Sequence, residues 1–391
     1  MSASDAGCPE VSIVLPCLNE ADTLGRCLAT ATRALREARI DGEVIVADNG
    51  STDGSPDIAR QGGARLVTVA AKGYGHALMG GIAAARGRYV IMGDADDSYD
   101  FLETPKFVAK LREGYDLVQG CRLPRGGGTI MPGAMPFTHR WIGNPLFSRL
   151  SRWWFRAPIH DVYCGMRGFS KRHYESLHQQ CTGMEFATEM IVKSSLYHGR
   201  MTEVPITLHP DGRHAHPPHL RTWRDGWRTL RFLLMYCPRW LFLFPGALLI
   251  VLGLIGYALA LPGVRVGGIQ FDAHTLLFSS LAILCGYQAI LFAIFAKTFA
   301  INAGLMPADP LMTRFYEVVN LERGIVLGLI ASIFGCALLA WAFNDWRLKE
   351  FGPLDYAQTM RAVIPGANLT ALGVQTIFSG FFVSLLGMDR R

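Results

Sequence analysis

The spacing of apolar residues divides the chain into two regions with different periodicities. In residues 11 to 121, short apolar runs alternate with stretches whose apolar residues have helical spacing. From Trp240 onwards, long apolar stretches follow one another with few charges between them. The first pattern is typical of an α/β domain with a mainly parallel sheet, and the second is typical of membrane-spanning helices.

The first region predicts five buried strands separated by four helices. Parallel strands connected by helices form a Rossmann-like sheet with helices on both faces, in which ligands bind outside the carboxyl ends of the strands. The predicted strands are Val11–Pro16, Glu43–Ala47, Ala64–Val69, Tyr89–Gly93 and Leu117–Gly120, and the predicted helices are Glu20–Ala38, Asp53–Gln61, Gly75–Ala85 and Phe101–Glu113.

Four stretches without Asp, Glu, Lys or Arg are long enough to cross the roughly 30 Å hydrocarbon layer of a bilayer. Four spans place both termini on one side of the membrane. Near the span ends, that side has ten Lys and Arg residues, and the other side has four. We therefore expect a multi-pass membrane protein with the first domain and both termini in the cytoplasm. If the source is a bacterium, this membrane is the inner or plasma membrane. The absence of charge inside the spans argues against an ion pump. The predicted spans are Trp240–Leu261, Ala273–Ala296, Gly324–Asn344 and Ala362–Met388.

An amphipathic helix is predicted at Leu220–Cys237, immediately before the first span. Its arginines share one face and its Leu and Trp residues share an adjacent face, which is typical of a helix in the headgroup plane. The arginines Arg221, Arg224, Arg228 and Arg231 would then lie where a lipid phosphate enters. The predicted organisation is a cytoplasmic domain at 1–219, this interfacial helix at 220–239, and an all-α domain of four membrane helices at 240–391.

Composition supports this division and narrows the function. Half of the 391 residues are apolar and only 18% are charged, which excludes a disordered chain or a single soluble domain. The net charge of +6 is too small and diffuse to indicate nucleic acid as a partner. Nine cysteines without a C-x-x-C pair fit a reducing compartment, and Met1–Glu10 lacks the features of a signal peptide.

Polar clusters follow three of the predicted strands: Asn19-Glu20, Asp48–Ser55 and Asp94-Ala95-Asp96. Carboxylates beside a phosphate repel it unless a cation lies between them, and an Asp-x-Asp at a strand end offers oxygen ligands to Mg²⁺ or Mn²⁺ bound to a diphosphate. The chain has no G-x-G-x-x-G after its first strand and no P-loop sequence, which disfavours a nicotinamide dehydrogenase and a P-loop ATPase.

In their order along the chain, these motifs resemble the family-two inverting glycosyltransferases of GT-A fold, and more closely the branch of dolichyl- or polyprenyl-phosphate mannose or glucose synthases. The resemblance covers roughly residues 9 to 239. It implies transfer of a hexose from a nucleotide-diphosphate sugar to polyprenyl phosphate with Mg or Mn, in glycan or cell-wall biosynthesis. The matching motifs are Val11–Pro16 with Asn19-Glu20, Asp48–Ser55, Asp94–Asp96, Gly120–Arg122, Asn144–Leu146, Asp161–Gly168, Glu185-Phe186 with Glu189, and Glu203–Ile206.

The resemblance also implies roles for particular residues. Asp94 and Asp96 would hold the metal, with Ser98 where many members have Gln. Catalysis would involve Asp96, Arg122 and Arg167, and the acceptor phosphate would meet Arg122, Arg167 and Arg213. From their positions alone, Arg221 and Arg224 are further candidates for the acceptor phosphate, and Lys72 for the donor. The donor nucleotide would be bound by Pro16, Leu18, Asn19, Glu20, Asp48, Asp94 and Ala95.

The chemistry of such a transfer does not require a nucleophile activated by a general base, and the chain shows no motif for one. An acceptor phosphate is already anionic near neutral pH, so no strong general base is required, and no Ser/His/Asp or Cys/His arrangement is evident. Two alternatives remain open: a processive or other-acceptor glycan synthase of the same fold, and a lipid flippase or scaffold with a degenerate transferase domain. Against processivity, Tyr236 and Phe137 stand where a Gln-x-x-Arg-Trp motif would have Gln. The nucleotide base, the sugar, the lipid length and any association of copies also remain open.

Overall fold

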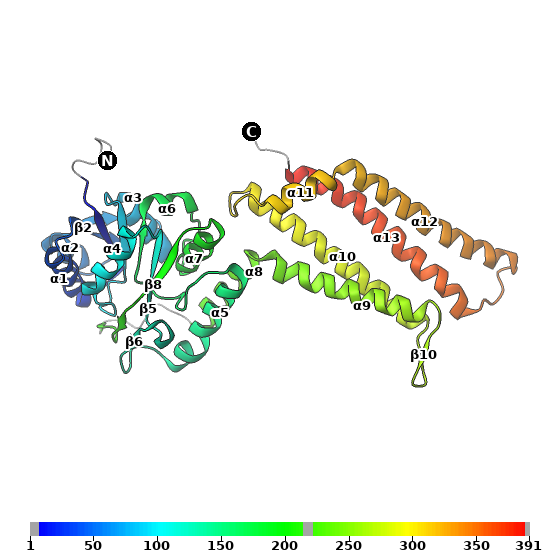
Figure 1. Ribbon diagram of the computed structural model, residues 1–391, viewed down its shortest axis with the longest axis horizontal. Coiled ribbons are helices and arrows are strands. Elements are labelled where there is room, and N and C mark those ends of the chain that lie inside the picture. The colour runs from blue at the N-terminus through cyan, green and yellow to red at the C-terminus, as the bar shows by residue number, and fades with distance from the viewer. Residues whose placement is uncertain (1–7, 214–221, 388–391) are drawn as a thin grey trace. The chain divides into compact units, whose positions relative to one another are not determined.

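The structure is a computed structural model that describes residues 8–213 and 222–387. By its internal contacts the chain divides into two units, Met1–Leu233 and Leu234–Arg391 (Figure 1). The first contains the large sheet and is called the α/β unit below. The second contains the long apolar helices and is called the helical unit.

The α/β unit is built on a seven-stranded sheet in the order β3-β2-β1-β4-β7-β5-β8. Strand β7 runs antiparallel to both of its neighbours, and the other neighbouring strands are parallel. The mainly parallel α/β fold expected from the sequence is therefore confirmed. The strands are β1 (Val11–Cys17), β2 (Gly42–Asp48), β3 (Arg65–Thr68), β4 (Tyr89–Met92), β5 (Leu117–Cys121), β7 (Arg167–Ser170) and β8 (Met201–Pro205).

Strand β7 was not predicted, although the five predicted strands all occur within two residues of their expected ends. It lies between β4 and β5 and pairs Phe169 with Val90 and Gly168 with Val118. A Cβ atom at Gly168 would lie 2.6 Å from Ile91 Cδ1, so a larger residue here would force this buried side chain to shift. The sequence Arg167-Gly168-Phe169-Ser170 is too short and too mixed in character to indicate a central strand.

Helices cover both faces of the sheet and create two apolar layers. Alternate residues of β1 point in opposite directions: Ile13 packs in the layer that contains Leu24 of α1, and Val14 packs in the layer that contains Leu78 of α3. Burial on both faces explains why the strands read as continuous apolar runs. The elements concerned are α1 (Ala21–Glu37), α2 (Ser55–Gln61), α3 (Tyr74–Ala84), η1 (Phe101–Glu103), α4 (Thr104–Arg112), α6 (Lys171–Leu177) and α7 (Phe186–Leu196).

A small second sheet places the last residues of the α/β unit beside the large sheet. Strand β6 (Thr129–Ile130) pairs with β9 (Thr207–Leu208), and beyond β9 the main-chain N–H of Gly212 donates to the carbonyl of Asp96 at 2.9 Å. Residues 209–213 thereby lie at the carboxyl end of β4. The remaining elements are η2 (Pro124–Gly126), the π-helical turn η3 (His139–Gly143), α5 (Asn144–Phe155) and α8 (Thr222–Met235).

The helical unit contains four helices that are long and apolar enough to cross a membrane: Arg239–Ala260, Ala273–Asn302, Leu321–Leu348 and Tyr356–Gly387. The four predicted spans each fall on one of them. Two antiparallel hairpins, α9–α10 and α12–α13, are joined by packing of α10 on α13. The elements are η4 (Arg239–Leu243), α9 (Phe244–Ala260), β10 (Arg265–Val266), β11 (Ile269–Gln270), α10 (Ala273–Asn302), α11 (Pro310–Val318), α12 (Leu321–Leu348) and α13 (Tyr356–Gly387).

Glycine contacts hold these hairpins together. A Cβ atom on Gly246 of α9 would lie 2.7 Å from the carbonyl oxygen of Gly286 of α10, and one on Gly286 would lie 2.6 Å from that of Gly246. In α12 and α13, Gly328 and Gly373 make the same kind of contact. Small residues allow helix backbones to approach closely in lipid, where van der Waals contact replaces hydrophobic burial as the main attraction.

Candidate functional site

The loops after β1 and β2 are tied together by side-chain hydrogen bonds. Asn19 has a left-handed φ of +60°, a conformation that asparagine tolerates, and its side-chain oxygen accepts from the N–H of Thr52 at 2.8 Å. In return, the N–H of Asn19 donates to the hydroxyl of Ser51, and the N–H of Glu20 donates to that of Ser55, both at 2.9 Å. The two loops therefore form one rigid surface at the strand ends.

Asp48 is the last residue of β2, and its buried carboxylate organises the turn that follows. It accepts hydrogen bonds from the main-chain N–H groups of Gly50 and Ser51, each at 3.1 Å. The strand register pairs Asp48 with Cys17, the last residue of β1, so the two loops begin at the same level of the sheet. The nucleotide-binding role expected for Asp48 stays a prediction.

Asn49 joins this turn to the loop before α3. Its amide donates to the carbonyls of Val69 and Ala71 and accepts from the N–H of Gly73 at 2.8 Å. The ammonium group of Lys72 donates to the main-chain carbonyl of Asn49 at 2.6 Å. Lys72, expected near the donor, therefore lies against the turn after β2.

Asp94 and Asp96 follow β4 and lie close together with different partners. Asp94 accepts from the hydroxyl of Tyr74 at 2.9 Å, and Asp96 accepts from both the N–H and the hydroxyl of Ser98, at 3.0 and 2.6 Å. Burial and the neighbouring charge of Asp96 raise the pKa of Asp94 to about 6. Ser98, which replaces the Gln of many family members, thus orients Asp96 through hydrogen bonds.

Arg213 reaches this acidic cluster from the far end of the α/β unit. Its guanidinium group makes a bidentate contact with the carboxylate of Glu20 at 2.7–3.1 Å, and one nitrogen lies 3.4 Å from Asp96. The contact joins residues 193 positions apart in the sequence. Arg213 therefore lies directly between a residue expected to bind the nucleotide and one expected to bind the metal.

Arg122 is held in a buried ion pair at the end of β5. Its guanidinium contacts both oxygens of Asp161 at 2.7 and 2.8 Å, and its main-chain N–H donates to the same carboxylate at 3.0 Å. A third nitrogen donates to the Tyr99 hydroxyl at 3.4 Å. The phosphate-binding role expected for Arg122 stays a prediction, and the structure adds Asp161 as the carboxylate that fixes its position.

Arg167 is fully buried, and carbonyl oxygens surround its guanidinium group. It donates to the carbonyls of Ala187 and Cys164 at 2.6 and 2.7 Å. Charge burial lowers the pKa of Arg167, while the neighbouring phenol of Tyr74 opposes that shift. The residue therefore connects β7 to α7. Contact with an acceptor phosphate stays a prediction.

The predicted motif around Glu189 supports the first turn of α3. Glu189 and Lys193 of α7 form a fully buried ion pair at 3.0 Å, and Glu189 also accepts from the N–H groups of Gln180 and Cys181. The next residue, Thr182, accepts from the N–H of Gly75 at 2.9 Å. This pair therefore fixes a loop that supports the first turn of α3, where Tyr74 lies.

The other predicted site residues lie in different surroundings. Pro16 and Ala95 are buried, and the carbonyl of Ala95 accepts from the hydroxyl of Thr23 at 2.6 Å. Leu18 is partly buried in the loop after β1. Arg224 is exposed on α8, and Arg221 lies outside the described residues. Tyr74 was missed as a site residue because its hydroxyl meets Asp94 only after α3 and β4 have packed together.

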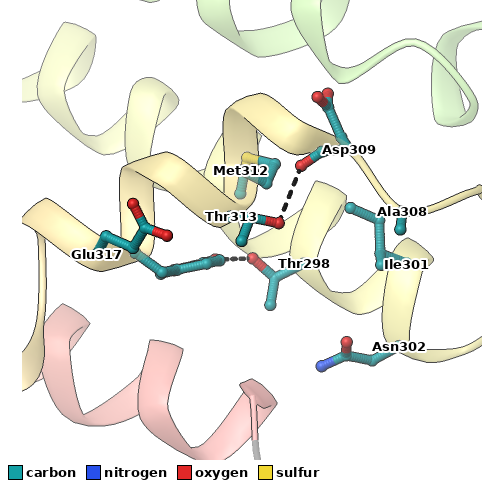
Figure 2. Close-up of a pocket in the computed structure, with 9 residues that line it drawn as sticks. Thr298, Ile301, Asn302, Ala308, Asp309, Met312, Thr313 and Glu317 are labelled. Carbon is teal, nitrogen blue, oxygen red and sulfur yellow. Dashed lines mark hydrogen bonds between the residues drawn. The ribbon is translucent and has the colours of Figure 1, made fainter.

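A separate cavity of about 460 Å³ lies within the helical unit, between the end of α10 and α11 (Figure 2). Thr298 and Tyr316 share a hydrogen bond across it, and Asp309 at its rim forms ion pairs with Lys297 and, at 4.0 Å, with Arg239. It is lined by Thr298, Ile301, Asn302, Ala308, Asp309, Met312, Thr313, Tyr316 and Glu317. The cavity contains none of the residues predicted from the sequence to bind a substrate.

Within residues 8–213 and 222–387, no group of three or more His, Cys, Asp or Glu side chains could hold a metal ion by itself. The α/β unit instead brings together Glu20, Asp48, Asp94, Asp96 and Arg213 at the carboxyl ends of β1, β2 and β4. A polar site at that edge, in a chain with four membrane helices, defines a membrane protein with a Rossmann-like ligand-binding domain.

Comparison with known proteins gives the family. Residues 12–177 match the model of glycosyl transferase family 2, and residues 294–387 match that of the glycosyltransferase family 2 C-terminal transmembrane region. The low-salt glycan biosynthesis hexosyltransferase Agl6 of Haloferax volcanii is 37% identical over 388 residues, which is 99% of this chain and 91% of that protein. The chain therefore belongs to glycosyltransferase family 2, and it is an integral membrane glycosyltransferase.

Two further similarities cover only part of the chain. A dolichyl-phosphate hexose transferase of Haloferax volcanii is 33% identical over 201 residues, which is 50% of this chain and 82% of that protein. A glucosyl-3-phosphoglycerate synthase structure from Mycobacterium tuberculosis, 24% identical, covers 59% of this chain and 81% of its own with a TM-score of 0.48. The second similarity is too low to bear on the chemistry.

Proposed function

We propose that the protein transfers a hexose from a nucleotide-diphosphate sugar to a polyprenyl phosphate, with inversion at the anomeric carbon. The observation that carries the proposal is the convergence of Asp48, Asp94, Asp96 and the Glu20–Arg213 pair at the carboxyl ends of three strands. Two relatives named as a hexosyltransferase and a dolichyl-phosphate hexose transferase support the sugar and the lipid class.

The donor nucleotide would lie against the joined loops after β1 and β2. Asp48 is fixed by two main-chain N–H groups, so its carboxylate is oriented before a ligand arrives. Glu20 and Asn19 line the neighbouring loop, which hydrogen bonds hold to the first. Preorganised acceptors of this kind suit the hydroxyl groups of a ribose.

The residues present fit a divalent cation bound together with a diphosphate. Two carboxylates lie side by side, and the pKa of Asp94 is raised by burial and by the charge of Asp96. Asp94 and Asp96 would hold Mg²⁺ or Mn²⁺, and diphosphate oxygens would complete the coordination. When bound, the cation supplies Lewis-acid stabilisation of the departing nucleoside diphosphate.

The chain's own cations would act on the phosphates. Arg213 is placed beside Asp96 by Glu20, and the planar guanidinium group is suited to bidentate phosphate contacts. Arg122 is held by Asp161 at the end of β5 and Arg167 is fully buried, so their roles would be electrostatic and positioning. Arg224, exposed on α8, would meet the lipid phosphate as it leaves the bilayer.

The acceptor phosphate oxygen would attack the anomeric carbon while the bond to the donor diphosphate breaks. Because that oxygen is already anionic, the site needs no general base. The distribution of Lys and Arg near the span ends supports a cytoplasmic α/β unit, where nucleotide sugars are available. The product would be a hexose linked to the lipid phosphate, with the nucleoside diphosphate released.

The test uses the full chain in nanodiscs with polyprenyl phosphate, Mg²⁺ or Mn²⁺, and a panel of uridine- and guanosine-diphosphate hexoses. We expect one donor to release its nucleoside diphosphate and to give a glycolipid that mild acid cleaves. Asp96→Asn should lower turnover by about a thousandfold because it removes the proposed metal ligand.

Asp97→Asn is the matched control, since Asp97 lies one residue away and pairs with Arg26 at 3.3 Å. That variant should retain most of the activity. Absence of a lipid-linked product with every donor would refute the proposal. Full function of Asp96→Asn would instead support a scaffold or lipid-moving role.

A further inference from the structure

The helical segment 137–155, formed by two residues of α-helix, η3 and α5, has an unusual distribution of side chains. Its inner face buries the small polar residues Asn144, Ser148 and Ser151. Its outer face exposes large apolar residues, the reverse of the pattern expected for a surface helix in water. These exposed residues, called the α5 aromatic face below, are Phe137 (71% exposed), Trp141 (61%), Ile142 (58%), Leu146 (49%) and Trp153 (60%).

The orientation of this helix is fixed by contacts on its inner face. The hydroxyl of Ser148 accepts from the N–H of Val162 at 3.2 Å, and the carbonyl of Phe155 accepts from the hydroxyl of Ser195 at 2.5 Å. Phe155 itself is buried. The outer residues therefore remain outside because hydrogen bonds at Ser148 and Phe155 and the burial of Phe155 fix the inner face on the domain.

The charged residues of this helical segment and of the residue that follows it all have the same sign. Residues 137–156 include Arg140, Arg149, Arg152 and Arg156 and no Asp or Glu. Arg140 lies over the ring of Trp141 at 5.4 Å, while Arg149 and Arg156 are exposed. A surface with aromatic residues and arginines and without acidic residues is suited to contact with a lipid bilayer whose headgroups are anionic. A symmetric contact between two copies would bring eight arginines together and is disfavoured by their repulsion.

A second helix of the chain, α8, has the same character. Trp223 and Trp227 are exposed on α8, the helix that leads into the first membrane helix. Arg228 of α8 lies 3.8 Å from Glu185, the residue before α7, and α5 packs against α7 (Figure 1). The chain thus has two segments with exposed aromatic residues and arginines, α5 and α8, and the second leads into the first membrane helix.

We propose that the α5 aromatic face inserts into the headgroup region of an anionic lipid bilayer. Trp and Phe side chains would occupy the boundary between headgroups and acyl chains, and Arg149 and Arg156 would pair with lipid phosphates. The α/β unit would then be attached to the membrane by a surface of its own, in addition to its covalent link to the helical unit. This proposal concerns membrane contact alone and does not depend on glycosyl transfer.

The test places a nitroxide spin label on the full chain in nanodiscs made of phosphatidylcholine with phosphatidylglycerol. Trp141→Cys and Leu146→Cys report on the face, and Asp57→Cys, an exposed position in α2, is the aqueous control. Cys8, Cys285 and Cys336 are exposed and are first replaced by Ser. We expect labels at 141 and 146 to collide with dissolved oxygen and to be shielded about tenfold from a water-soluble nickel complex, relative to the label at 57.

The role of charge is tested by the double variant Arg149→Glu, Arg156→Glu, with Arg149→Lys, Arg156→Lys as its matched control. The first should reduce the shielding, and the second should retain it. Equal nickel access at 141, 146 and 57 would overturn the proposal. Loss of nickel access without a gain in oxygen access, together with spin–spin broadening, would also overturn it, because a second copy would then cover the face.

Discussion

The two units of this chain are stabilised in opposite ways. In the α/β unit, buried charges are paired and bonded: Arg122 with Asp161, and Glu189 with Lys193. In the helical unit, glycines such as Gly246 and Gly286 allow helices to approach closely, and the membrane helices expose large apolar residues. Water allows the first unit to use hydrophobic burial, whereas lipid removes that driving force and leaves close contact.

This difference between the two units indicates that the binding site lies in the α/β unit. Charges are costly to bury, so a protein retains them where they are fully paired or where they bind something. In the acidic cluster of the α/β unit, Arg213 lies 2.7 Å from Glu20 and 3.4 Å from Asp96, and burial and the charge of Asp96 still raise the pKa of Asp94, so the cluster is suited to a further cation. The glycine contacts of the helical unit have no comparable chemical role.

The largest expected effect tests the paired charges. Asp161→Asn removes the carboxylate that accepts from three nitrogens of Arg122 and leaves a buried arginine without its counterion. We expect the α/β unit to lose about 3–5 kcal/mol of stability. Urea-dependent proteolysis of the full chain measures the change. In the exposed pair Arg60–Asp57, the control Asp57→Asn should cost less than about 1 kcal/mol, and an equal loss in both variants would contradict this contrast.

The next effect tests the glycine contacts. Gly373→Leu would place its side chain against the carbonyl of Gly328, 2.5 Å from the position of a Cβ atom. We expect the α12–α13 hairpin to lose about 2–4 kcal/mol, measured by thermal unfolding in nanodiscs. Gly324→Leu in α12 is the control, since a Cβ atom there meets nothing within 4 Å. If both leucines were tolerated equally, close packing would not explain the hairpin.

A smaller effect depends on pH and tests the site itself. Burial and the charge of Asp96 raise the pKa of Asp94 from 3.8 to about 6, so the folded protein binds this proton more tightly than the unfolded chain. The stabilising proton is present below pH 3.8 and is lost as the pH rises through 6. Asp94→Asn should therefore stabilise the metal-free protein by about 2–3 kcal/mol at pH 8 and by little at pH 4, while activity falls.

Unfolding curves at both pH values measure this difference. Asp57→Asn, an exposed substitution, should show no such pH dependence. Added Mn²⁺ should stabilise the wild-type protein at pH 8 more than Asp94→Asn, because binding a cation relieves the same repulsion. Destabilisation by Asp94→Asn at pH 8 would show that the carboxylate is structural.

The smallest effect concerns the phenol that orients Asp94. Tyr74→Phe removes a hydrogen bond of 2.9 Å and keeps the ring, so stability should fall by about 1 kcal/mol. The concentration of Mn²⁺ needed for half-maximal activity should change several-fold, with little change at saturation. Tyr174→Phe, in a ring stacked on Phe169, is the control and should leave the response to Mn²⁺ unchanged.

Much of the site could be predicted because its acidic residues directly follow strands. Asp48 and the Asp94–Asp96 pair were found in this way, since parallel strands bring their carboxyl ends to one edge. Strand β7 was not found, because four mixed residues carry no periodicity of their own and become a strand only between β4 and β5. Tyr74 was missed for a related reason: its position at the start of α3 gives no indication of which carboxylate it meets.

By itself the sequence determined the order of strands and helices along the α/β unit, the four membrane helices and the identity of the acidic cluster. Those features depend on local periodicity and composition, which each segment carries alone. Only the tertiary structure decided that Arg213 forms an ion pair with Glu20, 193 residues away, and that Arg122 forms one with Asp161. Such pairs form only when segments that are far apart in the sequence pack together. No local sequence pattern specifies which distant charged residue will pair with a buried one.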